Sequence, residues 1–342
     1  MKAVVIREHG GTQNLLYEDI ETPEPGPGEV LVRVKASGAN HLDHDLREGT
    51  SGIPHELPHI PGVEGAGVVA KLGSGVTEVK EGDRVCVGYL QSCGVCRMCR
   101  AGYDGICLEG KRMGATQWGS HAEYVRLEAR HCIPMPDKLD FETAAASLIC
   151  FPTAWHMTVT LGKVTAGQDV LVNAAGSGVG TCAIQVAKMH GARVIASAGS
   201  DKKLALAKEL GADALINYET HDLAEETHRH TGGKGADLVI ESVGGDVYEK
   251  SIKAAAFDAT IVIAGGHAGE KPIFDVIEFF RKQLHMHGSH YASRLEIEHV
   301  LGLVAEGKLK PVIHTVAPLS DIQNIARMTA NRDFFGKMVL VP

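Results

Sequence analysis

The chain has 342 residues, a formal net charge of −8, 44% hydrophobic residues and 22% charged residues. This length allows two domains with full-sized cores, and the composition excludes a disordered chain. The acidic balance argues against a nucleic-acid partner, because nucleic-acid binding requires a basic surface.

No targeting or membrane segment is expected. The N-terminus, MKAVVIREHGG, becomes charged before it reaches the length of a signal peptide. The uncharged stretch 170–187 has the length of a membrane span, but its glycines and Asn173 favour a strand, a turn and a helix. We therefore predict a cytoplasmic protein with reduced thiols, which are available to a metal.

The first 130 residues are predicted to be rich in β-strands. In residues 28–38, Val30, Val32 and Val34 alternate with polar or larger neighbours, the period of a half-buried strand. Residues 64–73, 83–90 and 121–127 repeat this pattern between turns that contain glycine and proline. A small barrel is the expected architecture.

Four cysteines, Cys93, Cys96, Cys99 and Cys107, lie close together in this half. Their spacing suits tetrahedral zinc, and four thiolate ligands leave no position for water or substrate, so one structural zinc ion is predicted. One alternative is four unrelated thiols. The other is two disulfides, and disulfide frameworks are typical of short secreted chains. The other cysteines are expected to be buried free thiols: Cys86, Cys132, Cys150 and Cys182.

From about residue 140 the pattern changes. Residues 141–159 are predicted to form one buried helix that links the two halves. Short apolar runs then alternate with amphipathic stretches, which is typical of a parallel sheet with helices on both faces. The expected strands are 169–174, 192–198, 236–242, 260–266 and 284–289, with helices that begin near Val179, Lys202 and Val247. The tail, 334–342, alternates like a strand and is expected to return to the N-terminal half.

A glycine-rich turn follows the first of these strands and opens a helix. Such a turn lets the backbone approach a pyrophosphate, whose charge is stabilised at the helix N-terminus. The three fingerprint positions are occupied by Ala175, Ser177 and Gly180, and the residues between them are Gly176, Gly178 and Val179. A dinucleotide site is therefore predicted here.

The end of the next strand bears on the choice of cofactor. NAD sites place an acid there to hold the ribose 2′-hydroxyl, whereas NADP sites offer cations. Ala198 stands where the acid is expected, and Ser200, Lys202 and Lys203 suit a 2′-phosphate. NADP(H) is favoured, with NAD(H) as the alternative, because Asp201 could supply the acid after a shift of one residue.

Together these motifs resemble the medium-chain dehydrogenase/reductase superfamily, which includes zinc alcohol dehydrogenases and quinone oxidoreductases. The resemblance rests on PEPGPGEVLVRVKASG, PGVEGAGVV, the four cysteines, HAEYV, the AAGSGVG turn and FGKMVLV. It implies an α/β fold with two domains. A GroES-like barrel would comprise 1–130 and 293–342, with a zinc lobe at about 91–110, and a Rossmann domain would comprise 131–292. It also implies a homodimer or homotetramer joined through the strand at 284–289.

The catalytic-zinc ligands of the alcohol dehydrogenases are missing from the matching positions. The resemblance places Asn40, Val63 and Ile149 where those enzymes carry ligands, and Leu42 where they carry a hydroxyl. Valine cannot coordinate zinc, and asparagine is a poor ligand beside thiolate or imidazole. An atypical metal site is the alternative, built from the histidines and acids near the N-terminal half: His41, Asp43, His44, Asp45, His55 and His59.

Without a Lewis acid, hydride transfer remains feasible to an activated acceptor such as a quinone or an enone. The resemblance implies that Asn40 donates to the substrate oxygen and that Asp43 orients the site. It also implies cofactor contacts from His41, Thr153, Ser197, Val243, Gly265, His267, Ser289 and Lys337. Two alternatives stay open: an alcohol dehydrogenase or ketone reductase with an atypical metal site, and a non-catalytic nucleotide-binding redox sensor.

Overall fold

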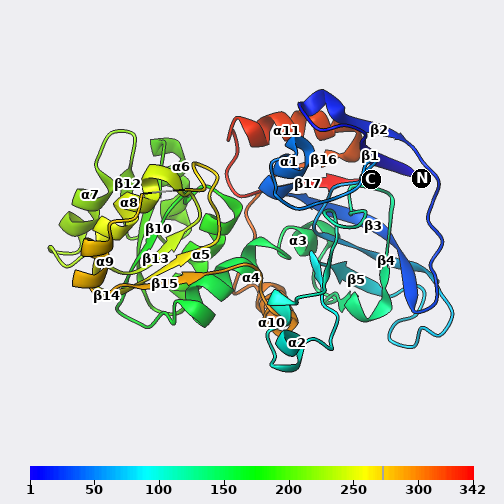
Figure 1. Ribbon diagram of the computed structural model, residues 1–342, viewed down its shortest axis with the longest axis horizontal. Coiled ribbons are helices and arrows are strands. Elements are labelled where there is room, and N and C mark those ends of the chain that lie inside the picture. Colours follow the sequence, from blue (N-terminus) through cyan, green and yellow to red (C-terminus); the bar gives the residue numbers. More distant parts are fainter. Residues whose placement is uncertain (272) are drawn as a thin grey trace. The chain divides into compact units, whose positions relative to one another are not determined.

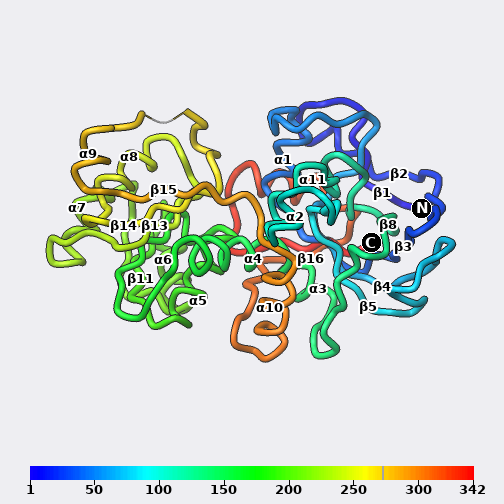
Figure 2. Tube along the Cα trace, turned by 60° about the horizontal axis from the view of Figure 1, so that its bottom comes forward, coloured from blue at the N-terminus to red at the C-terminus, as the bar shows by residue number. Residues whose placement is uncertain are grey.

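The computed structural model describes residues 1–271 and 273–342. By its internal contacts the chain divides into two compact units. Unit 1 contains Met1–Ile149 and Ser293–Pro342, and unit 2 contains Cys150–Ala292. Both chain termini therefore belong to unit 1 (Figures 1 and 2). None of the helices in the described ranges has the length and apolar character needed to span a membrane.

Unit 1 is built on a sheet with the strand order β16–β17–β3–β4–β5–β9, and β8 also pairs with β3. Val30, Val32 and Val34 of β3 lie in its core while Arg33 is exposed, as the alternation predicts. The tail strand β17 pairs antiparallel with β3, so it returns to the N-terminal half. The strands of unit 1 are β1 (Lys2–Ile6), β2 (Leu15–Asp19), β3 (Glu29–Ala39), β4 (Gly65–Leu72), β5 (Arg84–Val87), β6 (Leu90–Gln91), β7 (Lys111–Arg112), β8 (Tyr124–Glu128), β9 (Ile133–Pro134), β16 (Ile313–Pro318) and β17 (Lys337–Val341).

Short helices connect these strands. The helices of unit 1 are α1 (His41–Glu48), α2 (Arg97–Arg100), α3 (Phe141–Ala145), α10 (Arg294–Ala305) and α11 (Ile322–Ala330). The 3₁₀ turns are Thr12–Asn14, Asp104–Ile106, Ala129–His131 and Leu319–Asp321. Helix α10 begins beside the cysteine lobe, because the Arg294 backbone N–H donates to Asp104 Oδ2 at 3.0 Å (Figure 1).

Unit 2 is a six-stranded parallel sheet with the order β12–β11–β10–β13–β14–β15. Helices α5 to α8 pack on this sheet (Figures 1 and 2). The strands are β10 (Asp169–Val172), β11 (Arg193–Ala198), β12 (Ala214–Asn217), β13 (Ala236–Glu241), β14 (Ala255–Ile263) and β15 (His285–Gly288). The helices are α4 (Cys150–Trp155), a π-helix (His156–Leu161), α5 (Gly178–Met189), α6 (Asp201–Glu209), α7 (Leu223–His230), α8 (Gly245–Ala254) and α9 (Val276–Arg281).

The prediction of one continuous helix over 141–159 is wrong. Helix α3 ends at Ala145 and α4 begins at Cys150, with Pro152 in its first turn, where proline's missing N–H is tolerated. Between them the Ile149 N–H donates to Glu64 Oε2 at 2.8 Å. Residues 131–149, which the predicted division assigns to the Rossmann domain, belong to unit 1 here, since α3 packs on β3 and β4.

Candidate active site

Four cysteine side chains converge in the lobe formed by β6, α2 and β7. Their Sγ atoms lie within 4.8 Å of one another, and Cys96 Sγ is 3.6 Å from Cys99 Sγ and 3.9 Å from Cys107 Sγ. Four sulfur atoms bound to one zinc ion at about 2.3 Å would lie about 3.8 Å apart. The Cys96 N–H also donates to Cys93 Sγ at 3.3 Å, which favours thiolate. The cluster therefore fits a closed, structural zinc site.

Two of these thiols differ in acidity. Hydrogen bonds from the N–H groups of Cys99 and Leu108 lower the pKa of Cys96 to about 6. Burial, followed by hydrogen bonds with its sulfur neighbours, raises the pKa of Cys99 to about 12. A metal-free lobe at neutral pH would therefore hold Cys96 as thiolate and Cys99 as thiol. Zinc binding must displace the Cys99 proton, so the affinity for zinc rises with pH.

We expect the Cys99→Ser variant to retain less than about one tenth of the wild-type zinc, because one of four ligands is lost. Without the metal the four cysteines no longer hold the lobe together, so residues 91–110 should also become sensitive to protease. One bond that ties the lobe to its surroundings comes from Arg130, whose Nη1 donates to Cys93 O at 3.0 Å. Zinc per chain is measured by elemental analysis. Cys182→Ser, which removes a buried thiol outside the lobe, is the control. Full zinc content in Cys99→Ser would contradict the assignment.

The cysteines outside the lobe are buried free thiols, as predicted. Burial raises the pKa of Cys86 to about 12 and that of Cys132 to about 12. We expect neither to react with iodoacetamide at pH 8 in the folded protein, because the thiolate is the nucleophile. Peptide mass mapping after alkylation checks this, with urea-unfolded protein as the positive control. Equal labelling of folded and unfolded protein would be the contrary result.

A buried ionic network joins three segments of unit 1 at Glu64, which has no solvent exposure. Lys337 Nζ lies 2.6 Å from Glu64 Oε1, and also donates to Asn40 Oδ1 at 2.7 Å and to Ala39 O at 2.9 Å. Asn40 Nδ2 donates to Glu64 Oε1 at 2.8 Å, and the Ile149 N–H donates to Glu64 Oε2. The buried carboxylate and ammonium therefore satisfy one another, as buried charges require, and the half-buried Asn40 amide bonds to both.

The glycine-rich turn of unit 2 has the geometry of a phosphate-binding turn. It follows β10 and leads into α5, a helix of 12 residues whose N-cap is Ser177, with its Oγ accepting from the Gly180 N–H at 3.0 Å. A Cβ at position 180 would lie 2.3 Å from Ala174 O, so only glycine permits this close packing of helix on strand. The free N–H groups at this helix end suit a pyrophosphate.

Comparisons with known proteins agree with both halves of this description. The family model for the alcohol dehydrogenase GroES-like domain matches residues 26–137, and that for zinc-binding dehydrogenase matches 178–306. An alcohol dehydrogenase of Schizosaccharomyces pombe is 32% identical over 340 residues, 99% of this chain and 97% of that protein. The chain belongs to the zinc-type medium-chain dehydrogenase/reductase superfamily. The predicted family and fold class are thereby confirmed.

Two solved structures illustrate the range of this superfamily. A crystal structure of an NAD-dependent alcohol dehydrogenase is 45% identical, with a TM-score of 0.94 and full coverage of both chains. A mycobacterial quinone oxidoreductase is 26% identical, with a TM-score of 0.81, again over both whole chains. The shared fold thus supports an oxidoreductase acting on a small molecule, and leaves the acceptor to be argued from the site.

The residues at the superfamily's catalytic-zinc positions do not fit zinc in this chain. The three positions do converge, because Asn40 and Ile149 both bond to Glu64, and Val63 precedes it. However, the side chains of Val63 and Ile149 offer no donor atom, and both polar atoms of the Asn40 amide are engaged. The positive charge at this point is the Lys337 ammonium, which would repel a second cation.

Two members of the alternative metal set do lie together, because His41 and Asp45 offer ligand atoms within 4.8 Å of one another. Within unit 1, all of which the structure describes, the four cysteines are the only group of three or more potential ligands that converge. His44 Nδ1 pairs with Arg47 Nη2 at 3.0 Å, and His59 Nε2 pairs with Gly114 O at 2.9 Å. Burial lowers the pKa of His59, so its imidazole is neutral at pH 7. His55 Nδ1 bonds to Ile53 O at 3.0 Å, which uses another candidate ligand locally.

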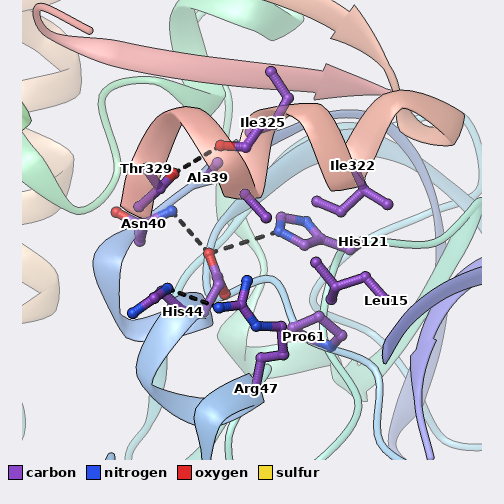
Figure 3. A pocket seen from close by; sticks show the side chains of 12 residues that line it. Leu15, Ala39, Asn40, His44, Arg47, Pro61, His121, Ile322, Ile325 and Thr329 are labelled. Carbon is purple, nitrogen blue, oxygen red and sulfur yellow. Dashed lines mark hydrogen bonds and ion pairs between the residues drawn. The ribbon is translucent and has the colours of Figure 1, made fainter. Parts of the chain in front are cut away.

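Asp43 holds the backbone at the start of α1. Its carboxylate accepts from the Asn40 N–H at 2.8 Å and from the Gly62 N–H at 3.0 Å, an orienting arrangement. Behind it lies His121, whose Nε2 is 3.6 Å from Asp43 Oδ2 and whose Nδ1 pairs with Ser37 Oγ at 2.8 Å. A small cavity of about 20 Å³ lies among these groups and Arg47, enough for one water molecule (Figure 3).

The predicted 2′-phosphate residues Ser200, Lys202 and Lys203 follow the end of β11. Ser200 is the N-cap of α6, and Lys202 is exposed in its first turn. Asp201 also lies in this turn, where its Oδ1 accepts from Asn217 Nδ2 at 2.7 Å. Ser197, a predicted cofactor contact within β11, is fully buried and donates to Asn173 Oδ1 at 2.8 Å, so its hydroxyl faces the protein interior.

The remaining predicted contacts of unit 2 lie at the carboxyl edge of the sheet or beside it. Val243 follows β13, Gly265 follows β14 and Ser289 follows β15, while His267 is exposed. Thr153 is buried in α4. Sequence reasoning missed the buried polar residues that hold the site segments of the two units, because no local motif marks their partners. These residues are Glu64 and His121 in unit 1 and Asn173 and Glu241 in unit 2.

Proposed function

We propose that this protein is an NADPH-dependent oxidoreductase that reduces an activated acceptor, a quinone or an α,β-unsaturated carbonyl, without catalytic zinc. The observation that supports this most strongly is the Lys337–Glu64–Asn40 network at the superfamily's zinc position, beside Val63 and Ile149. These side chains supply no Lewis acid to polarise an unactivated ketone or to acidify an alcohol. A conjugated acceptor needs only stabilisation of the oxyanion that hydride addition creates.

Asn40 is the residue through which unit 1 would stabilise that oxyanion. Lys337 donates to its Oδ1, which polarises the amide and increases the acidity of the Nδ2 hydrogens. One Nδ2 hydrogen is held by Glu64 at 2.8 Å, and the other makes a longer contact of 3.2 Å to Gly38 O. A substrate oxygen would take over this weaker contact. NADPH, when bound in unit 2, would supply the hydride, and the enolate or quinol oxyanion that results would then gain a proton from solvent.

The second candidate is alcohol dehydrogenase activity with an atypical metal site. It is favoured by the NAD-dependent alcohol dehydrogenase structure, which is 45% identical to this chain. Asp201 at the end of β11 would suit the NAD that such an enzyme uses. A non-catalytic nucleotide-binding redox sensor remains the third reading.

The test is a substrate screen on purified protein of known zinc content. We expect NADPH oxidation with 1,4-benzoquinone or 2-cyclohexen-1-one, and less than about 1% of that rate with saturated ketones or, in reverse, with primary alcohols. Asn40→Ala should lower the enone rate by about 10²-fold while NADPH binding persists. Alcohol turnover that depends on a second zinc would support the second candidate. NADPH binding without turnover would support the sensor.

The preference for NADPH has its own test at Lys202. We expect Lys202→Glu to weaken NADPH binding by about tenfold and to leave NADH binding within about twofold, because a 2′-phosphate loses its cation. Titration of the nucleotide fluorescence gives both dissociation constants. Lys208→Glu, also exposed on α6, is the matched control. If both variants weaken NADPH binding equally, Lys202 does not contact the 2′-phosphate.

We also propose a cytoplasmic homodimer or homotetramer that pairs through β15. This strand is the outer edge of the six-stranded sheet, so its outer N–H and C=O groups have no strand beside them in the described chain. Next to it in sequence, α9 exposes Val276, Ile277 and Phe280, with exposed fractions of 58%, 54% and 60%. Apolar side chains at this density on a surface favour an interface between copies. Light scattering of the wild type and of Phe280→Asp tests it.

A further inference from the structure

A buried carboxylate at the end of β13 plays no part in the chemistry described above. Glu241 is the last residue of this strand and has no solvent exposure. Its Oε1 accepts from the Val243 N–H at 2.6 Å and the Gly244 N–H at 3.0 Å. Its Oε2 accepts from Asn173 Nδ2 at 2.6 Å and from Ser251 Oγ at 2.7 Å. Each carboxylate oxygen therefore receives two hydrogen bonds.

These donors belong to separate segments at the carboxyl edge of the sheet. Asn173 follows β10 and precedes the glycine-rich turn, while Val243 and Gly244 form the loop between β13 and α8. Ser251 lies within α8. Asn173 extends the network to β11, because its Oδ1 accepts from Ser197 Oγ at 2.8 Å. One carboxylate thus connects the turn that suits the pyrophosphate to the loop 242–244, which contains the predicted cofactor contact Val243 and which the resemblance to the superfamily places around the nicotinamide.

The four groups that donate to the Glu241 carboxylate are all neutral, so none of them is a cation. A buried charge of this kind persists only where hydrogen bonds replace its hydration. The loop that it holds is conformationally constrained, because Gly244 has a φ of +77° and a Cβ there would lie 2.5 Å from Gly269 O. A network this complete fixes the positions of its members.

We propose that Glu241 is a positioning residue that holds the loop 242–244 against the glycine-rich turn and thereby sets the affinity for the nicotinamide half of the cofactor. The proposal rests on the dinucleotide-binding part of the proposed function, and does not depend on the acceptor. The adenine half would bind near the end of β11, which the carboxylate does not touch directly. Disturbing Glu241 should therefore affect the two halves of the cofactor unequally.

The isosteric variant Glu241→Gln introduces a mismatch that no rotation of the side chain relieves. If the new amide oxygen faces Val243 and Gly244, the new NH₂ faces the donor Nδ2 of Asn173 at about 2.6 Å. Rotating Asn173 would satisfy that NH₂, and the Ser197 oxygen could accept from the turned Asn173 amide, but the Ser197 hydroxyl hydrogen would then lose Asn173 Oδ1 as its acceptor. Asn173 Nδ2 also lies 2.8 Å from Ser251 Oγ. The double variant Asn173→Asp/Glu241→Gln restores the pairings, because Asp accepts from Gln, from Ser197 and from Ser251.

The experiment compares NADPH with 2′,5′-ADP, a probe that lacks the nicotinamide half, by titration calorimetry. We expect Glu241→Gln to raise the Kd for NADPH by about 10- to 100-fold and that for 2′,5′-ADP by less than about twofold. The double variant should return the NADPH Kd to within about threefold of wild type. Equal weakening of both ligands in a folded Glu241→Gln protein, or no rescue by the double variant, would overturn the proposal.

The choice of nucleotide by the wild-type protein separates a failure of this proposal from a failure of the predicted NADPH preference. If wild-type protein binds NADH and not NADPH, the NADPH preference fails, and the same variants are then compared with NADH and 5′-AMP. The expected ratios are unchanged, because the network lies on the nicotinamide side. Should Glu241→Gln fail to fold, Ser251→Ala removes one donor to Oε2 and is expected to weaken NADPH binding by about three- to tenfold with the same selectivity. Unselective weakening there would also overturn the proposal.

Discussion

Replacing Lys337 with methionine is expected to lower the free energy of unfolding by about 3–5 kcal/mol. The substitution keeps much of the side-chain volume but leaves the Glu64 carboxylate, which is fully buried, without its counter-ion. The amide of Asn40 loses the donor to its Oδ1 at the same time. Urea unfolding followed by circular dichroism measures the change. Glu64 has no solvent exposure, so solvent cannot replace its missing partner.

Two controls separate this buried pair from an ordinary ion pair. Lys71→Met removes an exposed partner of Glu24, and should cost less than about 0.5 kcal/mol because water screens such pairs. The double variant Glu64→Gln/Lys337→Met removes both charges, and should recover at least about half of the stability lost by the single variant. A cost below about 1 kcal/mol for Lys337→Met would show that the pair is solvated in solution.

The fold was predictable where the sequence repeats a local period. The alternation of Val30, Val32 and Val34 identified β3, and the apolar runs identified β10, β11, β13 and β14. Elements without a clear period were missed. Strand β12 has only four residues, and α7, with the sequence LAEETHRH, is polar over most of its surface. The break before Cys150 was also missed, because the Ile149 N–H bonds to Glu64 and not within a helix.

At the candidate site the sequence indicates which residue types stand at a position more readily than which of them contact one another. A missing zinc ligand is visible at one position, as Val63 shows, whereas a hydrogen bond needs two positions that fold together. Glu64 and Lys337 are 273 residues apart, and nothing local to either one indicates the other. Lys337 was expected at the cofactor, yet its ammonium is held by Glu64, Asn40 and Ala39. The same reason hid the partners of Glu241, which come from three separate segments.

The three substitutions Asn40→Cys, Val63→His and Ile149→Cys, made together, are expected to raise the zinc content from about one to about two ions per chain. The backbone at these positions already converges, since Asn40 and Ile149 both bond to Glu64 and Val63 is its neighbour. Two thiolates and an imidazole make a three-ligand site of the catalytic type, with one position open. Elemental analysis of protein purified without chelator counts the ions, and an added cation should also raise the melting temperature of the variant.

Lys337 makes this a demanding test, because its ammonium lies 2.6 Å from Glu64 and would repel an incoming zinc ion. If that charge substitutes for the metal, adding Lys337→Met to the triple variant should tighten zinc binding by about tenfold or more, although Lys337→Met alone destabilises the wild type. When Cys99→Ser is added to these four substitutions, the chain should hold about one zinc ion, which distinguishes the rebuilt site from the cysteine lobe. The zinc content of the triple variant could stay at one ion per chain both before and after Lys337→Met is added. That result would mean that these positions are too far apart to bind a metal. The inference that the Lys337 network occupies the place of a catalytic zinc would then be wrong.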